Sequence, residues 1–139
     1  MQIATRGNTT ILRLDHGEDV LESILKGVGD SNSTIMLTAG LGMISDFELG
    51  YFDNGRYITR SFAEAYELLS MQGSVATEGD PKLHVHVAVA NKSHEAFGGH
   101  LMRGKVWMSN EICLLRIEGL GSSRQIDEVK KVGVLRLKT

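Results

Sequence analysis

Four of the five histidines of this chain lie between positions 84 and 100. His84 and His86 are two residues apart, so on a β-strand both side chains point to one face, about 7 Å from each other. His100 follows Gly98 and Gly99, a pair that is able to turn the chain sharply. Neutral imidazole is a common ligand for zinc, copper, iron and nickel. The pattern predicts a divalent-metal site, with zinc as the first choice. A polar strand face without a metal is the alternative.

Two further side chains are candidates for proton transfer beside such a metal. Glu111 lies in an otherwise apolar segment, and a carboxylate near a metal can orient a ligand or act as a base. His94 is surrounded by polar residues, and we expect it at the tip of a solvated loop, as we do His16 near the start of the first helix. Glu111 and His94 are therefore the catalytic candidates, and the sequence alone assigns no catalytic residue.

The sequence contains none of the common motifs for nucleophilic catalysis or nucleotide binding. There is no Gly-x-Ser-x-Gly motif, no P-loop and no dinucleotide fingerprint. Gly40-Leu41-Gly42 is too short to hold a phosphate, and we expect it to form a tight bend. The single cysteine, Cys113, lies in an apolar run and is predicted to be a buried small hydrophobic residue. No nucleophile for covalent catalysis stands out.

Composition is that of an ordinary globular protein. The chain has 139 residues, 42% of them hydrophobic and 23% charged, which predicts one domain over residues 1–139. Its net charge of -2 is unfavourable for DNA binding over a broad basic surface. A local basic patch is still compatible with the sequence. No segment is long and apolar enough to span a membrane, and none resembles a signal peptide. We expect a cytoplasmic protein that does not bind membranes.

The hydrophobic pattern predicts mostly strands and one main helix. Apolar residues recur at helical spacing over 18–28, while 9–14 and 132–137 read as short strands. Asn54-Gly55 predicts a two-residue hairpin turn. Residues 61–75 leave two possibilities, since Ser61 and Glu64 fit a helix-capping box and the following residues alternate as in a strand. The sum is an α+β fold with a mostly antiparallel sheet.

The histidine pair lies on the most regular of these strands. Over residues 83–90 the valines alternate with the histidines and two alanines. The valine face is predicted to join the core, and the opposite face would carry His84 and His86 beside small side chains. Residues 105–119 predict another long strand or a pair of strands.

Several blocks of this chain resemble the PPC domain, the plant and prokaryote conserved domain. The blocks are HVHV, AFGGHLMRGKV and SNEICL, preceded by TAGLGMISDFELGYFD and YELLSMQGSV, and together they cover about residues 8–120. The resemblance implies an α+β fold, a homotrimer, and metal binding through His84, His86 and His100. Plant members carry AT-hooks that bind DNA, and this chain has none. Glu64 and Ala65 also stand where the plant proteins have Gly-Arg.

Three functions are therefore open. The first is a free-standing, homotrimeric PPC-like domain with a metal site and a DNA-binding or regulatory role. The second is a small metal-dependent enzyme that uses the three histidines. The third is a purely structural trimer module in which the histidines form hydrogen bonds between subunits.

Overall fold

The computed structural model describes residues 1–138 and has an α+β architecture, as predicted. Within these residues a seven-stranded sheet and a three-stranded sheet accompany one helix. The elements are β1 Gln2–Arg6, β2 Thr9–Asp15, α1 Val20–Val28, β3 Thr34–Asp53, β4 Arg56–Phe62, β5 Tyr66–Val75, β6 Glu78–Gly79, β7 Leu83–Ala90, β8 Ala96–Ile117, β9 Gly121–Ile126 and β10 Gly133–Lys138.

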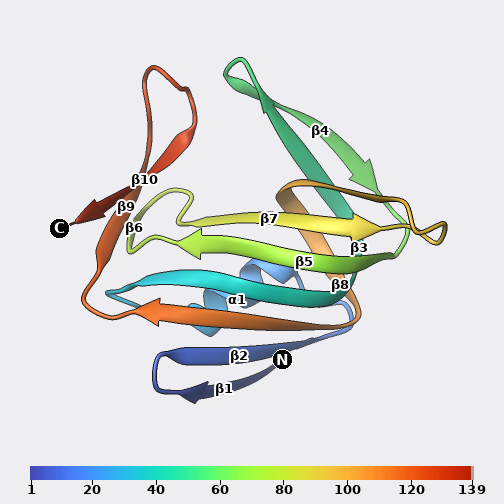
Figure 1. The fold of residues 1–139 in the computed structure, drawn as a ribbon, viewed down its shortest axis with the longest axis horizontal. Helices are drawn as coiled ribbons and strands as arrows, with labels where there is room; N and C mark the ends of the chain where they lie inside the picture. Colours follow the sequence, from blue (N-terminus) through green and yellow to red (C-terminus); the bar gives the residue numbers. More distant parts are fainter. Residues whose placement is uncertain (139) are drawn as a thin grey trace.

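The large sheet is antiparallel throughout and is organised by its two longest strands. Its order is β1-β2-β8-β7-β5-β3-β4, and β8 also pairs with β3. The first residues of β8 pair with β7, whereas most of its length pairs with β3. Strands β3, β5, β7 and β8 therefore pair in a closed cycle. Figure 1 shows β3 and β8 bending as they pass from one part of the sheet to another.

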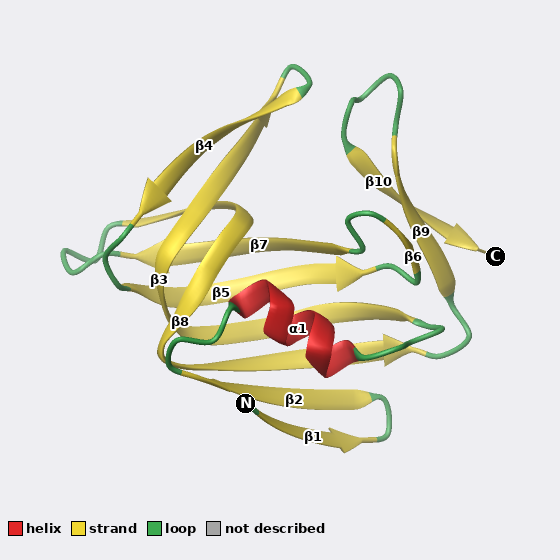
Figure 2. Cartoon of the chain, turned by 180° about the vertical axis from the view of Figure 1, so that it is seen from behind, coloured by secondary structure: helices red, strands yellow, loops and turns green. Residues whose placement is uncertain are grey.

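Helix α1 covers one face of this sheet (Figure 2). It begins after Asp19, whose carboxylate accepts a hydrogen bond from the Glu22 amide at 3.0 Å and so caps the first turn. It ends at Gly29, which has the positive φ of 61° that glycine adopts readily. Val20 and Ile24 are fully buried against the sheet. The helix predicted over 18–28 is thus confirmed, with its start two residues later.

The structure tests two predictions, the hairpin at Asn54-Gly55 and the helix-capping box at Ser61. Asn54 and Gly55 both have positive φ and join β3 to β4, so the hairpin is confirmed. The capping box at Ser61 is wrong, because residues 61–62 complete β4 and the next strand starts at Tyr66. The Ser61 hydroxyl donates instead to the Glu48 carboxylate at 2.8 Å.

Three other expectations need correction. Gly40-Leu41-Gly42 forms no tight bend, since β3 continues through it with local register shifts. The pair Gly98-Gly99 does not turn the chain either, because it lies inside β8 and the turn is formed by residues 91–95. Cys113 points to the face of the sheet opposite the core and is partly exposed rather than buried.

Candidate metal centre

The alternation of β7 places two histidines on one face. Val85, Val87 and Val89 are buried in the core, while His84 and His86 project from the opposite face. This confirms the two-residue periodicity read from the sequence. The third histidine arrives on β8, where His100 is the direct antiparallel partner of His86.

Two glycines let the strands approach closely enough to form the cluster. A Cβ at Gly98 of β8 would lie 2.3 Å from the Val87 carbonyl oxygen. A Cβ at Gly73 of β5 would lie 2.1 Å from the carbonyl oxygen of His84. Real Cβ atoms do not approach backbone oxygens so closely, so larger residues at either position would displace β7. The two glycines therefore do not form a turn. They allow the close strand packing that positions the imidazoles.

The three imidazoles meet at one point. His84, His86 and His100 each offer a ring nitrogen, and these atoms all lie within 4.8 Å of one another. The Nε2 atoms of His84 and His86 are 3.0 Å apart. Two nitrogens bound to one tetrahedral zinc at about 2.0–2.1 Å would be separated by about 3.3 Å, close to the spacing seen here.

The surroundings of His84 and His100 favour the neutral form of these two imidazoles. Burial, followed by the neighbouring His100 and His86 and then the Arg124 charge, lowers the pKa of His84 to about 4. Burial also lowers the pKa of His100, with the His86 and Arg124 charges adding to it. A metal binds the unprotonated ring nitrogen, so these shifts keep the ligands ready at neutral pH.

One ring nitrogen of the cluster still needs a partner. His100 Nδ1 is buried and has no hydrogen-bond partner among the described residues. A buried polar atom without a partner is costly unless a ligand satisfies it. The His100 ring also packs on Tyr57 of β4, with centroids 4.9 Å apart. The donor set and its spacing fit a metal.

The other candidates from the sequence lie elsewhere. Glu111 is exposed further along β8, where it pairs with Arg13 of β2 and Leu41 of β3. His94 has a positive φ and lies in the exposed turn that joins β7 to β8. Among residues 1–138 the cluster contains neither of them. His16 is exposed, and its ring contacts Trp107 edge-on at 4.8 Å.

Sequence reasoning missed Arg124, the charged residue beside the histidines. Arg124 comes from β9 and is only 4% exposed. Its Nη2 donates to the Ser74 hydroxyl at 2.7 Å, and its Nη1 lies 3.3 Å from His84 Nδ1. Forty residues separate it from His84, and no local motif marks it. The only signal was a lone arginine in an otherwise uncharged segment, GSSRQI.

The sequence profile described as the Plants and Prokaryotes Conserved (PCC) domain matches residues 1–118. The chain belongs to this family. It is the PPC family of the resemblance described above, and the match confirms that expectation over most of the chain. No curated protein matches the chain.

Solved structures of similar proteins have the same fold. A plant- and prokaryote-conserved protein of Pyrococcus horikoshii is 26% identical, with a TM-score of 0.84 over 99% of this chain and 96% of that chain. A protein of Ralstonia eutropha, provisionally named as DNA-binding, is 22% identical with a TM-score of 0.85, over 98% and 96% of the two chains. A metal-containing protein of Archaeoglobus fulgidus is 26% identical with a TM-score of 0.80 and covers 92% of each chain.

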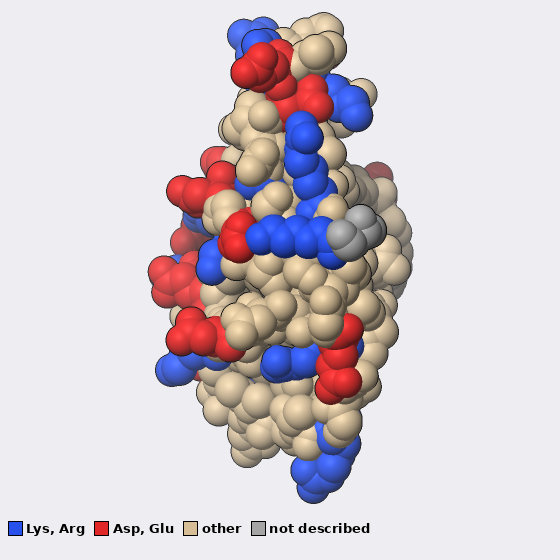
Figure 3. All heavy atoms as spheres, turned by 90° about the vertical axis from the view of Figure 1, so that its left-hand side faces the viewer, with Lys and Arg blue, Asp and Glu red and all other residues tan. Residues whose placement is uncertain are grey.

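One face of this PPC domain carries side chains of both charges. In Figure 3, lysine and arginine side chains form a short run in the upper half of this face, and aspartate and glutamate side chains lie beside it and below it. This agrees with the net charge of -2. Within residues 1–138, no helix has the length and apolar character needed to cross a membrane.

Proposed function

We propose that this PPC domain binds a divalent metal through His84, His86 and His100, and that the metal is zinc. The convergence of three imidazoles, whose ring nitrogens lie within 4.8 Å of one another, carries the proposal. Zinc accepts three histidine ligands and keeps a fourth position for water or another ligand. In that arrangement a bound zinc would act as a Lewis acid at its open position. The metal-containing relative from Archaeoglobus fulgidus adds support.

Metal analysis of purified protein tests this proposal. After dialysis against zinc and removal of excess ion, we expect one zinc per chain in the native protein. His86→Ala should reduce the zinc content by at least tenfold, since one of three ligands is lost. The matched control is His94→Ala, which removes an exposed histidine outside the cluster and should leave the content unchanged. Equal zinc content in His86→Ala and native protein would overturn the proposal.

We further propose that the domain assembles as a homotrimer through the sheet face opposite α1. Apolar side chains are exposed there, among them Met36 and Leu41, which are 38% and 53% exposed, and Ile11 on β2. An exposed apolar face of this kind is typical of a protein interface. Light scattering should give three times the chain mass for the native protein. Met36→Glu should shift it towards the monomer, and a native monomer would contradict the proposal.

A role in DNA binding or regulation is the third part of this proposal. It is supported by relatives from Ralstonia eutropha and Bacteroides thetaiotaomicron that are provisionally named as DNA-binding proteins. The net charge of -2 argues for weak binding at most. Mobility-shift assays at about 50 mM salt, where phosphate contacts are strongest, provide the test. A concentration-dependent shift would support the role, and no shift under these conditions would end it.

The enzyme and the structural-module alternatives have less support. In the described part of the chain, Glu111 and His94 are outside the histidine cluster, so neither is placed to transfer a proton there. In a purely structural module the histidines would stabilise the assembly without binding metal. A metal-free native protein whose trimer is weakened by His86→Ala would favour that alternative.

A further inference from the structure

A cavity of about 250 Å³ lies directly beside the histidine cluster. His84 and His100 line one side of it, and Tyr57, Met102 and Arg124 complete the wall nearest to them. The β3–β4 hairpin and the loop between β9 and β10 flank the cavity, and Figure 1 shows both rising above β7. The cavity is therefore placed to bring a small molecule to the open position of a metal held by the histidines.

The charge of the cavity is entirely positive. Arg56, Arg124 and Lys131 contribute to its lining, and no aspartate or glutamate does so among the described residues. Arg124 is almost completely buried, yet none of the ion pairs within residues 1–138 includes it. A buried charge without a counter-charge is costly, and a divalent metal would add to the imbalance. The charges that line the cavity therefore favour an anionic ligand.

The guanidinium of Arg124 has donors left for such an anion. It has five N–H groups. Its two side-chain contacts are Ser74 and His84, and its buried Nε has no partner. A metal at His84 Nε2 would also leave the proton on Nδ1, so that His84 could no longer accept from Arg124. Metal binding would thus free a further donor on the same guanidinium.

We propose that the cavity binds a small organic carboxylate, with its carboxylate group between Arg124 and the metal position. This inference extends the proposed function and rests on it, because it assumes the proposed metal site. Arginine pairs with carboxylate through two parallel N–H···O bonds, which suits the free donors of Arg124. The body of the ligand would contact apolar walls formed by Phe52, Leu83, Met102 and Val132. A monoanion with an apolar or aromatic body matches one buried arginine in a cavity of this size.

Calorimetric titration with benzoate tests the proposal, using zinc-loaded and metal-free protein. Benzoate should bind the zinc-loaded protein, and Arg124→Gln should weaken this binding at least tenfold. Arg136→Gln is the matched control, because Arg136 is exposed on β10 and does not line the cavity. Benzamide, a neutral compound of the same shape, should bind at least tenfold more weakly than benzoate. Thermal unfolding checks that each variant is folded.

A second variant tests benzoate binding in the cavity if Arg124→Gln does not fold. Val132→Trp fills the cavity from the loop between β9 and β10 without removing a charge, and it should abolish benzoate binding while zinc content stays unchanged. Benzoate affinity equal to native in either folded variant would overturn the proposal. Inorganic phosphate that binds more tightly than benzoate, or benzamide that binds equally well, would overturn the carboxylate class.

The two proposals fail in different ways. A protein that takes up zinc but binds no benzoate contradicts only the carboxylate inference. A protein that takes up no zinc contradicts the proposed function. In that case, benzoate binding to the metal-free protein that depends on Arg124 still supports the anion site.

Discussion

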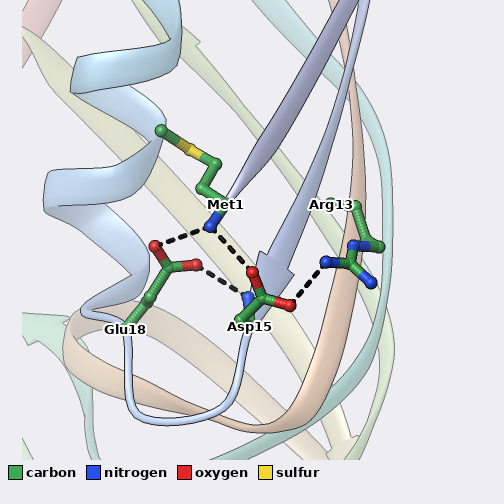
Figure 4. Close-up of polar contacts among 4 residues, drawn as sticks. All are labelled: Met1, Arg13, Asp15 and Glu18. Carbon is green, nitrogen blue, oxygen red and sulfur yellow. Dashed lines mark hydrogen bonds and ion pairs between the residues drawn. The ribbon is translucent and has the colours of Figure 1, made fainter.

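Two charged clusters in this molecule differ in how their charges are balanced. At the N-terminal corner, the Met1 ammonium donates to Asp15 at 2.8 Å and to Glu18 at 3.1 Å, and Arg13 donates to Asp15 at 2.6 Å (Figure 4). Each cation there faces a carboxylate. At the histidine cluster, Arg124 is buried beside three imidazoles and has no carboxylate partner within residues 1–138.

The difference separates a structural cluster from a binding site. The corner is complete as it stands, and it holds the chain start against the entry to α1. Arg13 and Asp15 are both about half exposed, so the contribution of their ion pair to stability is small. The histidine cluster has unused donors and a nitrogen without a partner. An anion would balance the charge of Arg124 and of the proposed metal, and for that reason we place the proposed function there.

The largest effect should come from a glycine beside the histidines. Gly73→Ala puts a Cβ against the His84 carbonyl oxygen, so it should lower the free energy of unfolding by about 4 kcal/mol and disrupt zinc binding. Gly7→Ala, in the β1–β2 turn, meets no atom within 4 Å and suffers only from its positive φ, so about 1 kcal/mol is expected. Urea denaturation of both variants measures the difference. Equal losses would show that the close approach at Gly73 is unimportant.

The two clusters should lose their contributions to stability in different ranges of acidic pH. The folded-state pKa of His84 is lowered from 6.5 to about 4, so the unfolded chain takes up the proton first. The metal-free protein should lose stability as the pH falls from about 6.5 to about 4. Hydrogen bonding to the N-terminal ammonium lowers the pKa of Asp15 below 3.8, and the Asp15 amide lowers that of Glu18 below 4.5. The corner should therefore lose stability only at more acidic pH.

Denaturation curves at several pH values check this order. His84→Gln should flatten the loss above pH 4, while Asp15→Asn should leave that part of the curve unchanged. At alkaline pH only the corner of the two clusters should respond, because Asp15 and Glu18 raise the pKa of the Met1 ammonium above 8.0. Its contribution to stability should be lost as the pH rises from about 8.0 through this raised pKa. A His84→Gln curve that is parallel to the native one would contradict the assignment.

Removing a charge should change the zinc affinity at the histidine cluster but not at the N-terminal corner. Arg124→Gln removes a cation that repels the metal, so zinc should bind about tenfold more tightly in a buffer without carboxylates. Competition with a chromophoric chelator measures the affinity. Asp15→Asn removes a carboxylate that has two cationic partners and should leave zinc affinity unchanged. Weaker zinc binding in Arg124→Gln would mean that Arg124 supports the histidines instead of opposing the metal.

The smallest expected effect is the salt dependence of the corner. The stability difference between native protein and Asp15→Asn should shrink from low salt to 1 M sodium chloride, where the screening length is about 3 Å. Thermal unfolding at both salt concentrations measures it. A difference that is unchanged by salt would show that the corner depends on geometry more than on charge.

Local pattern was enough to predict much of this molecule. The helix over 18–28, the Asn54-Gly55 hairpin and the alternation of β7 follow from spacing and turn chemistry within a few residues. The meeting of His84 and His86 on one face is a consequence of that alternation. Each of these features is decided by neighbours along the chain.

Features that depend on distant partners could not be read in the same way. Gly98 looked like a turn residue, but its requirement comes from the Val87 carbonyl on a neighbouring strand. β9 and β1 carry weak strand patterns and form through pairing with β10 and β2. Arg124 reaches the histidines only through this pairing and packing. The sequence therefore indicated the candidate metal ligands and not the cation beside them.

The most direct test of the central claim is diffraction from crystals of zinc-loaded protein at the zinc absorption edge. We predict one strong anomalous peak per chain, bounded by the ring nitrogens of His84, His86 and His100. No peak at this position, or zinc bound only elsewhere on the chain, would contradict the account.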